Sequence, residues 1–132
     1  MQENLVILLI DDDPDDRKLF FEAVKEIDED ITCILSSSGL EALNYLRSGS
    51  NRIPDFIFLD LRMPGLSGQK CLEEIKKDKK LSAIPVIVYT TSKEVKESIA
   101  LKKMGAVHFM SKPTSTDEIY YMVSCAINEK WD

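Results

Sequence analysis

The sequence predicts an α/β fold in which a five-stranded parallel sheet carries helices on both faces, and three observations support this. Strand-like and helix-like patterns alternate five times along the 132 residues, as in a doubly wound sheet. The first strand-like run is continuously apolar, as a strand buried on both faces should be. Four of the five runs end at an acid, a hydroxyl or a lysine, and the carboxyl ends of parallel strands share one crevice.

The first half of the chain predicts two strand–helix units. Residues 5–10 read Leu-Val-Ile-Leu-Leu-Ile, and the helix after them begins near Pro14, a residue favoured in the first helical turn. Residues 31–37 are less apolar, so this second strand is expected at an edge. Ser38 and Glu41 form a capping-box pattern that opens the second helix. The apolar stripe of the first helix is Leu19, Phe20, Ala23, Val24 and Ile27.

The second half predicts three more strands, at residues 55–60, 85–90 and 106–111. A turn-rich loop and a third helix follow the first of them. The fourth helix is expected at residues 93–104, with Gly105 as its C-terminal stop. The last helix follows a second capping-box pattern, and its i, i+3, i+4 stripe is Ile119, Met122, Val123, Ala126 and Ile127.

Length and composition indicate one domain over residues 1–132, with no linker and no output domain expected. A net charge of −6 argues against a general nucleic-acid or membrane-surface binder. The three cysteines lack metal-binding spacing, which predicts reduced thiols and a cytoplasmic location. Neither a signal peptide nor a run of about 20 apolar residues is visible.

The acids at the strand ends predict a metal site. Asp11 and Asp12 follow the first strand, and Asp60 ends the third. Two carboxylates about 5 Å apart repel by roughly 3 kcal/mol at an effective dielectric near 20, so their convergence requires a cation. Hard oxygen ligands suit Mg²⁺. The neighbouring acids are assigned instead to the first helical turn, where the helix dipole favours negative charge: Asp13, Asp15 and Asp16.

Two other strand ends carry groups suited to phosphate. Lys112 precedes Pro113, which restricts the lysine backbone, and its ammonium would neutralise the acids and bind a phosphoryl oxygen. A solvated surface lysine is the alternative. The Thr90 hydroxyl could donate to a bound phosphate, or Thr90 could be an ordinary β-branched strand residue.

With these residues in place, the chain resembles the CheY-like receiver domains of two-component response regulators over essentially its whole length. The resemblance rests on four motifs in receiver order and spacing: Asp11-Asp12, Leu59-Asp60-Leu-Arg-Met-Pro-Gly65, Val88-Tyr-Thr90 and Lys112-Pro113. It implies a flavodoxin-like sheet with strand order 2-1-3-4-5. Residues 76–84 and 90–92 further resemble the stand-alone receivers that accompany phytochrome-type histidine kinases.

The resemblance also implies the chemistry. A histidine kinase would phosphorylate Asp60, and Mg²⁺ would be held by Asp12, Asp60 and the backbone carbonyl of Arg62, with Asp11 acting through water. Lys112 and Thr90 would bind the phosphoryl group. The protein would not be an enzyme beyond catalysing its own phosphorylation and dephosphorylation.

Switching would involve an aromatic residue on the fifth strand, where this chain has Phe109 instead of the more frequent tyrosine. A plain core aromatic is the alternative reading. Arg62 is expected to shield the acyl phosphate from water or to be an ordinary surface charge. The Lys112–Pro113 peptide bond is expected to be cis by the same resemblance.

The partners implied are a histidine kinase as phosphodonor, a downstream protein that the sequence does not identify, and possibly a second copy of the chain. Phe21 and Tyr121 lie off the apolar stripes. Exposed aromatics at such positions suit docking, and the alternative is that they are ordinary exposed apolar residues. One alternative function is a pseudo-receiver that works as an adaptor without being phosphorylated. A second is a haloacid-dehalogenase-type phosphatase, which Arg62 disfavours because it stands where a second acid is required.

Overall fold

The computed structural model describes residues 5–49, 52–61, 63, 65–90, 95–113 and 115–128, with the backbone alone at residues 90 and 95–98. Five strands form one parallel sheet in the order β2-β1-β3-β4-β5. This confirms the predicted fold class, the strand order and the edge position of the second strand. The strands are β1 (Val6–Ile10), β2 (Thr32–Ser36), β3 (Phe56–Asp60), β4 (Val86–Thr90) and β5 (His108–Ser111).

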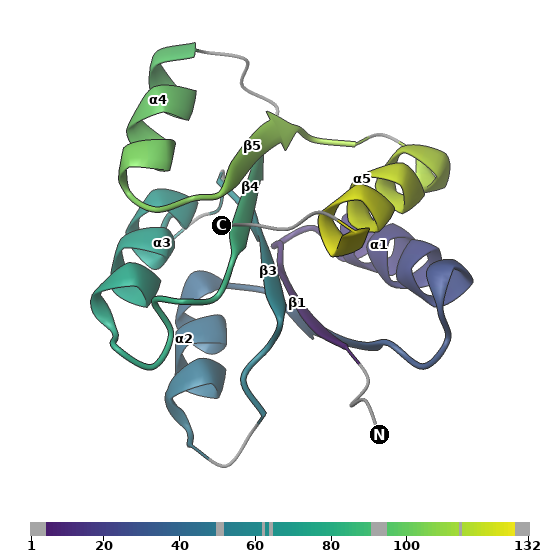
Figure 1. The fold of residues 1–132 in the computed structure, drawn as a ribbon, viewed down its shortest axis with the longest axis horizontal. Helices are drawn as coiled ribbons and strands as arrows, with labels where there is room; N and C mark the ends of the chain where they lie inside the picture. The colour runs from purple at the N-terminus through teal and green to yellow at the C-terminus, as the bar shows by residue number, and fades with distance from the viewer. Residues whose placement is uncertain are drawn as a thin grey trace.

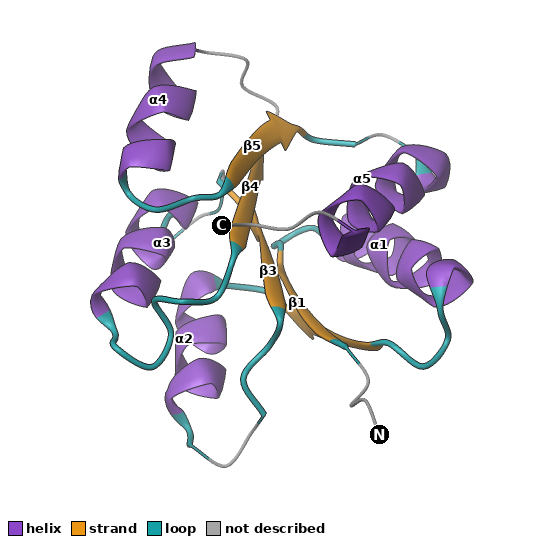
Figure 2. Ribbon diagram, viewed as in Figure 1, coloured by secondary structure: helices purple, strands orange, loops and turns teal. Residues whose placement is uncertain are grey.

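The five helices among the described residues cover the sheet on both faces. The helices α1 and α5 pack on one face and α2, α3 and α4 on the other (Figure 1, and by element type in Figure 2). In the described part of the chain no helix combines the length and apolarity that a membrane crossing requires. The bounds are α1 (Pro14–Ile27), α2 (Gly39–Arg47), α3 (Gly68–Lys77), α4 (Val95–Lys103) and α5 (Thr116–Asn128).

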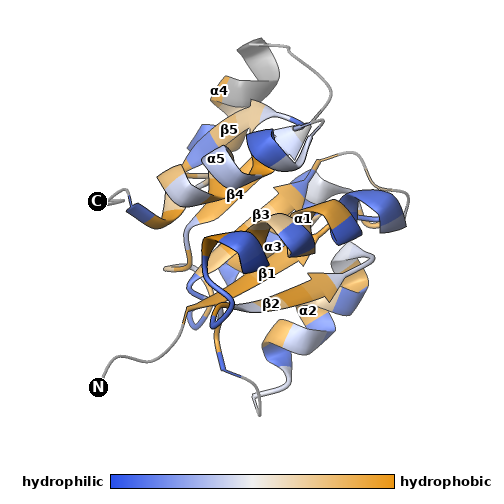
Figure 3. Ribbon diagram, turned by 90° about the vertical axis from the view of Figure 1, so that its right-hand side faces the viewer, coloured by the Kyte–Doolittle hydropathy of each residue, from blue (hydrophilic) through white to orange (hydrophobic). Residues whose placement is uncertain are grey.

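The sheet separates two apolar cores because successive strand side chains point to opposite faces. Leu8 and Ile10 face α2 and α3, whereas Ile7 and Leu9 face α1 and α5. All four side chains are fully buried, which explains the uninterrupted apolar run of β1. Figure 3 shows the hydrophobic strands between helices whose outer surfaces are hydrophilic.

Side-chain caps fix the starts of the helices. The Asp13 carboxylate accepts from the Asp15 and Asp16 backbone N–H groups at 2.8 and 3.3 Å. Ser38 Oγ accepts from the Glu41 N–H at 3.1 Å, but the Glu41 carboxylate reaches Ser37 instead of completing the capping box on Ser38.

Three predictions for the C-terminal half of the chain have different outcomes. Gly105 has φ of +110° two residues beyond Lys103, the last residue of α4, which confirms it as the helix stop. The described part of α4 begins at Val95, so the predicted start at residue 93 lies outside the described residues. The Lys112–Pro113 peptide is trans, so the expectation of a cis bond is wrong. The trans form is the lower-energy isomer of most X–Pro bonds.

Candidate functional site

Three carboxylates meet at the carboxyl ends of β1 and β3. One oxygen each of Asp11, Asp12 and Asp60 lies within 4.8 Å of the other two. Asp11 directly follows β1 and Asp60 is the last residue of β3, and these strands are parallel neighbours. Asp11 and Asp60 are only 1% and 2% exposed, whereas Asp12 is exposed. The predicted convergence of the three acids therefore occurs, with one side open to solvent.

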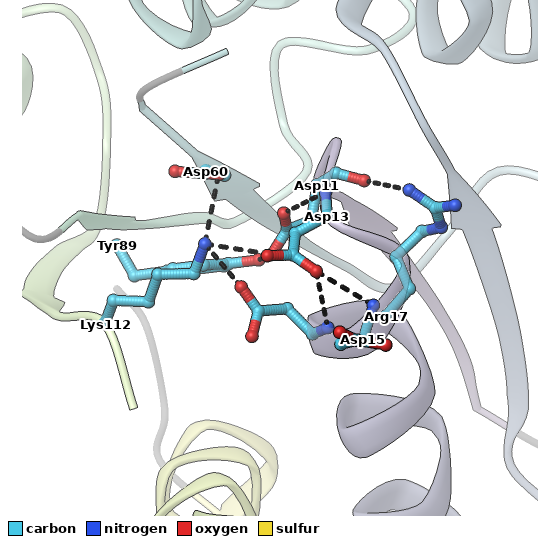
Figure 4. Close-up of polar contacts among 8 residues, drawn as sticks. Asp11, Asp13, Asp15, Arg17, Asp60, Tyr89 and Lys112 are labelled. Atoms are coloured by element: carbon cyan, nitrogen blue, oxygen red, sulfur yellow. Dashed lines mark hydrogen bonds and ion pairs between the residues drawn. The ribbon is translucent and has the colours of Figure 1, made fainter. Parts of the chain in front are cut away.

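Local hydrogen bonds hold the Asp11 carboxylate in one orientation. Its Oδ1 accepts from the Asp13 backbone N–H at 3.0 Å, and its Oδ2 accepts from the Tyr89 hydroxyl at 2.7 Å. The Arg17 guanidinium also donates to the Asp11 backbone carbonyl at 2.8 Å. Figure 4 shows these contacts around the end of the sheet. Buried charges need partners of this kind.

The Lys112 ammonium lies among the acids. Its Nζ is 3.4 Å from Asp60 Oδ2, 3.5 Å from Asp11 Oδ2 and 2.7 Å from Asp16 Oδ2. Burial acts to lower the Lys112 pKa, but the Asp16 hydrogen bond and the nearby carboxylate charges together raise it above its ordinary value. Lys112 is therefore a paired cation rather than a solvated surface lysine.

A glycine keeps the loop after β3 against the strand end. A Cβ at Gly68 would lie 2.4 Å from the Asp60 carbonyl oxygen and 2.5 Å from the Leu61 Cα. The Gly68 N–H also donates to the Leu61 carbonyl at 3.1 Å. The start of α3 can approach Asp60 this closely only because residue 68 has no side chain.

The donor set fits a hard divalent cation. Three carboxylate oxygens within 4.8 Å of one another repel strongly at this separation, and carboxylates are the protein ligands that such cations prefer. Asp12 and Asp60 come from different segments, so a cation would link the loop after β1 to the end of β3. The residues present are therefore able to hold a metal ion.

The structure places the other predicted site residues only in part. The backbone of Thr90 ends β4 and is paired with Ser111 of β5, but its side chain is not among those described. Arg62 lies outside the described residues. Phe109 is half-buried on β5 and packs against the core under α3 and α4. This position is compatible both with a switch residue and with an ordinary core aromatic.

Two residues of the site were not predicted from the sequence. The predicted place of Asp16 in the first turn of α1 is confirmed, but its exclusion from the site is wrong because its carboxylate makes the 2.7 Å contact with Lys112. Tyr89 had no predicted role, yet it is 3% exposed and donates to Asp11. Burial and the Asp11 charge raise the Tyr89 pKa well above its ordinary value. Asp13, predicted with its neighbours at the helix start, is the N-cap that directly precedes the first turn of α1.

Sequence signals for both residues exist. A buried tyrosine hydroxyl needs a hydrogen-bond partner, and Tyr89 stands one residue before a strand end that faces the acids. Asp16 falls in the first turn of a helix that starts directly after the Asp11-Asp12 strand end, so its carboxylate is expected near the same end of the sheet.

Comparisons with known proteins agree with this geometry. The sequence model of the response regulator receiver domain matches residues 7–124. The response regulator Rcp1 of Synechocystis sp. is 32% identical over 122 residues, which cover 89% of this chain and 83% of Rcp1. The sensor histidine kinase CheAY of Helicobacter pylori is 28% identical over 127 residues, or 96% of this chain. The chain spans only 15% of the length of CheAY.

Solved structures show the same fold. The Mn(2+)-bound form of Rcp1 is similar with a TM-score of 0.80 at 32% identity, covering 92% of this chain and 90% of that one. The phosphorylated cyanobacterial phytochrome response regulator RcpA has a TM-score of 0.84 at 29% identity, covering 97% and 94%. With the family match over residues 7–124, the chain belongs to the response regulator receiver domain family.

Proposed function

We propose that this chain is a phosphorylation-controlled switch in which Asp60 accepts a phosphoryl group from a histidine kinase. One observation carries the proposal: the Asp60 carboxylate is almost fully buried, stands at a strand end in a three-carboxylate cluster and has the Lys112 ammonium at 3.4 Å. Such a carboxylate is positioned by the fold and has a cation beside it to offset added negative charge.

The transfer uses Asp60 as nucleophile. One of its carboxylate oxygens forms a bond to phosphorus, the bond from phosphorus to the phosphohistidine nitrogen breaks, and the electron pair leaves with the imidazole, which takes up a proton. A loose transition state of this kind needs positioning and charge stabilisation more than covalent assistance. Lys112 supplies positive charge at the oxygens, and Tyr89 keeps Asp11 oriented.

We propose Mg²⁺ as the cofactor. Asp12, Asp60 and the backbone carbonyl of Arg62 would hold it, with Asp11 acting through water. When bound, it would neutralise negative charge on the transferring phosphoryl group. The three-carboxylate cluster supports a divalent cation, and the related Rcp1 has been crystallised in a Mn(2+)-bound form.

The consequence of phosphorylation would be altered partner binding. Thr90 would bond the phosphoryl oxygens, and Phe109 would change its position on β5 and so signal to a downstream protein. We further propose a stand-alone receiver in the cytoplasm, able to form a homodimer and served by a phytochrome-type kinase. The similarity to RcpA, described as a cyanobacterial phytochrome response regulator, supports the kinase type.

Intact-mass spectrometry tests the proposal. Incubation with Mg²⁺ and acetyl phosphate should add one phosphoryl group to the protein. Asp60→Asn should abolish the addition, because an amide oxygen is a poor nucleophile. Asp30→Asn, which changes an exposed acid in the turn before β2, is the matched control and should be phosphorylated normally.

The opposite result would point to an adaptor. If the unmodified protein gains no mass while it remains folded by circular dichroism, the pseudo-receiver function is correct and Asp60 is not a phosphoacceptor. Phosphorylation that persists in Asp60→Asn would place the acceptor elsewhere.

A further inference from the structure

The nearest partner of the Lys112 ammonium is Asp16, and not the predicted phosphoacceptor. Among the described contacts of Lys112, the distance to Asp16 Oδ2 is 2.7 Å, against 3.4 Å to Asp60 and 3.5 Å to Asp11. The Lys112 side chain is 18% exposed and that of Asp16 is 30% exposed. The ion pair is therefore partly shielded from bulk water. Charge–charge interactions in such a partly buried position are stronger than at the open surface.

The position of Asp16 follows from the start of α1. Asp13 is the N-cap, so Asp16 is in the first turn with its backbone N–H bonded to the Asp13 carboxylate. This bond fixes the first turn, and the Asp16 side chain contacts Lys112, which follows β5. The ion pair thus joins α1 to the segment that follows the edge strand β5.

We propose that Asp16 competes with the phosphoryl group on Asp60 for Lys112 and so weakens the binding of that group. The inference rests on the proposed function. An ammonium has three N–H donors and a single positive charge. In the structure its shortest hydrogen bond goes to Asp16, so part of its charge is offset before any phosphoryl group arrives. A phosphoryl group beside Asp60 then meets a cation that is already paired.

The neighbouring Asp15 provides a matched control. Asp15 and Asp16 are both in the first turn of α1 and both have backbone N–H groups bonded to Asp13. Replacing either by Asn removes one negative charge from the same helix start. Asp15 is exposed, and only Asp16 contacts Lys112. The difference between the variants therefore isolates the contact from the general change in charge.

The experiment measures the dissociation constant of beryllium trifluoride, a phosphoryl mimic, by isothermal titration calorimetry at saturating Mg²⁺. Asp16→Asn should bind the mimic about fivefold more tightly than the unmodified protein, the value of an ion pair of about 1 kcal/mol. Asp15→Asn should remain within about twofold, because exposed charges are screened. Asp16→Glu should restore weaker binding by restoring the carboxylate.

A double-mutant cycle separates competition from a merely structural role. In a Lys112→Met background, Asp16→Asn should change the affinity no more than Asp15→Asn does. An effect of Asp16→Asn that persists without Lys112 would overturn the inference. Thermal melts of each variant would confirm that the proteins compared are folded.

The remaining outcomes also discriminate. If the unmodified protein binds the mimic but the two Asn variants behave alike, Asp16 does not compete and only this inference is wrong. Weaker binding by Asp16→Asn would likewise overturn it, because Asp16 would then hold Lys112 in its productive position. If the unmodified protein neither binds the mimic nor accepts a phosphoryl group, the proposed function fails as well.

Discussion

Two partly buried lysines at opposite ends of the sheet have different kinds of partner. Lys112, beyond the carboxyl end of β5, contacts three carboxylates. Lys76, near the end of α3, donates to the backbone carbonyls of Ser82 and Ile84 at 2.9 and 2.8 Å. Its aliphatic carbons also lie close to Gly105, because a Cβ there would be 3.0 Å from Lys76 Cγ.

The partners determine what each end of the sheet can do. Burial lowers the Lys76 pKa, because carbonyl dipoles compensate the ammonium charge less than a full negative charge does. At Lys112 the carboxylates outweigh the effect of burial and the pKa is raised. Lys76 therefore stabilises the loop between α3 and β4 through two hydrogen bonds. Lys112 instead stabilises the carboxylate cluster that includes the proposed phosphoacceptor Asp60.

The largest difference between the lysines should appear in phosphorylation. Lys112→Met should slow phosphorylation by acetyl phosphate on the order of a hundredfold, since it removes a positioned charge that stabilises the transition state. The rate is measured by intact mass over time. Lys76→Met is the control and should react at the normal rate. An equal loss in both variants would mean that the effect of Lys112 is on folding and not on chemistry.

The second difference should appear in stability. Lys76→Met keeps the apolar stem over Gly105 but leaves two carbonyls without their donor, so the free energy of unfolding should fall by about 2 kcal/mol. Urea denaturation measures it. Lys77→Met, on the same helix, removes an exposed lysine paired with Glu73 at 3.3 Å and should change stability by less than about 0.5 kcal/mol. Equal losses of stability in Lys76→Met and Lys77→Met would show that water replaces the Lys76 ammonium as the hydrogen-bond donor to the two carbonyls.

The smallest difference should appear at alkaline pH. Burial raises the Cys71 pKa from 9.0 to about 12, so the unfolded thiol ionises first and stability falls as pH rises from 9.0. The raised Lys112 pKa adds to this loss, because its contribution is complete below the unfolded value of 10.5 and disappears above it. The lowered Lys76 pKa acts in the opposite direction just below 10.5, where the unfolded chain binds more protons.

The two lysine variants should therefore change the alkaline slope oppositely. Relative to the unmodified protein, Lys112→Met should lose stability less steeply with pH and Lys76→Met more steeply, each by less than about 1.4 kcal/mol per pH unit. Urea denaturation between pH 9 and 11 gives the slopes. Parallel slopes in all three proteins would contradict the assigned directions of the lysine pKa shifts.

Most of the fold was predictable because its signals are local. The apolar run of β1, the i, i+3, i+4 stripe of α5 and the Gly105 stop each depend on residues near one another in the chain. The Lys112–Pro113 isomer was not predictable in this way, since the motif fits either form and the surrounding structure selects one. The Thr90 and Arg62 roles stay predictions.

The sequence alone determined which chemical groups stand at the strand ends. Parallel strands align their carboxyl ends, so Asp11, Asp60 and Lys112 lie at the same edge once the strands form one sheet. Only the tertiary structure decided the contacts around them. The bond from Tyr89 to Asp11, the ion pair of Asp16 with Lys112 and the close approach of Gly68 to Asp60 join separate segments. Their distances depend on how the helices and loops pack against the sheet, and no local pattern in the chain encodes that packing.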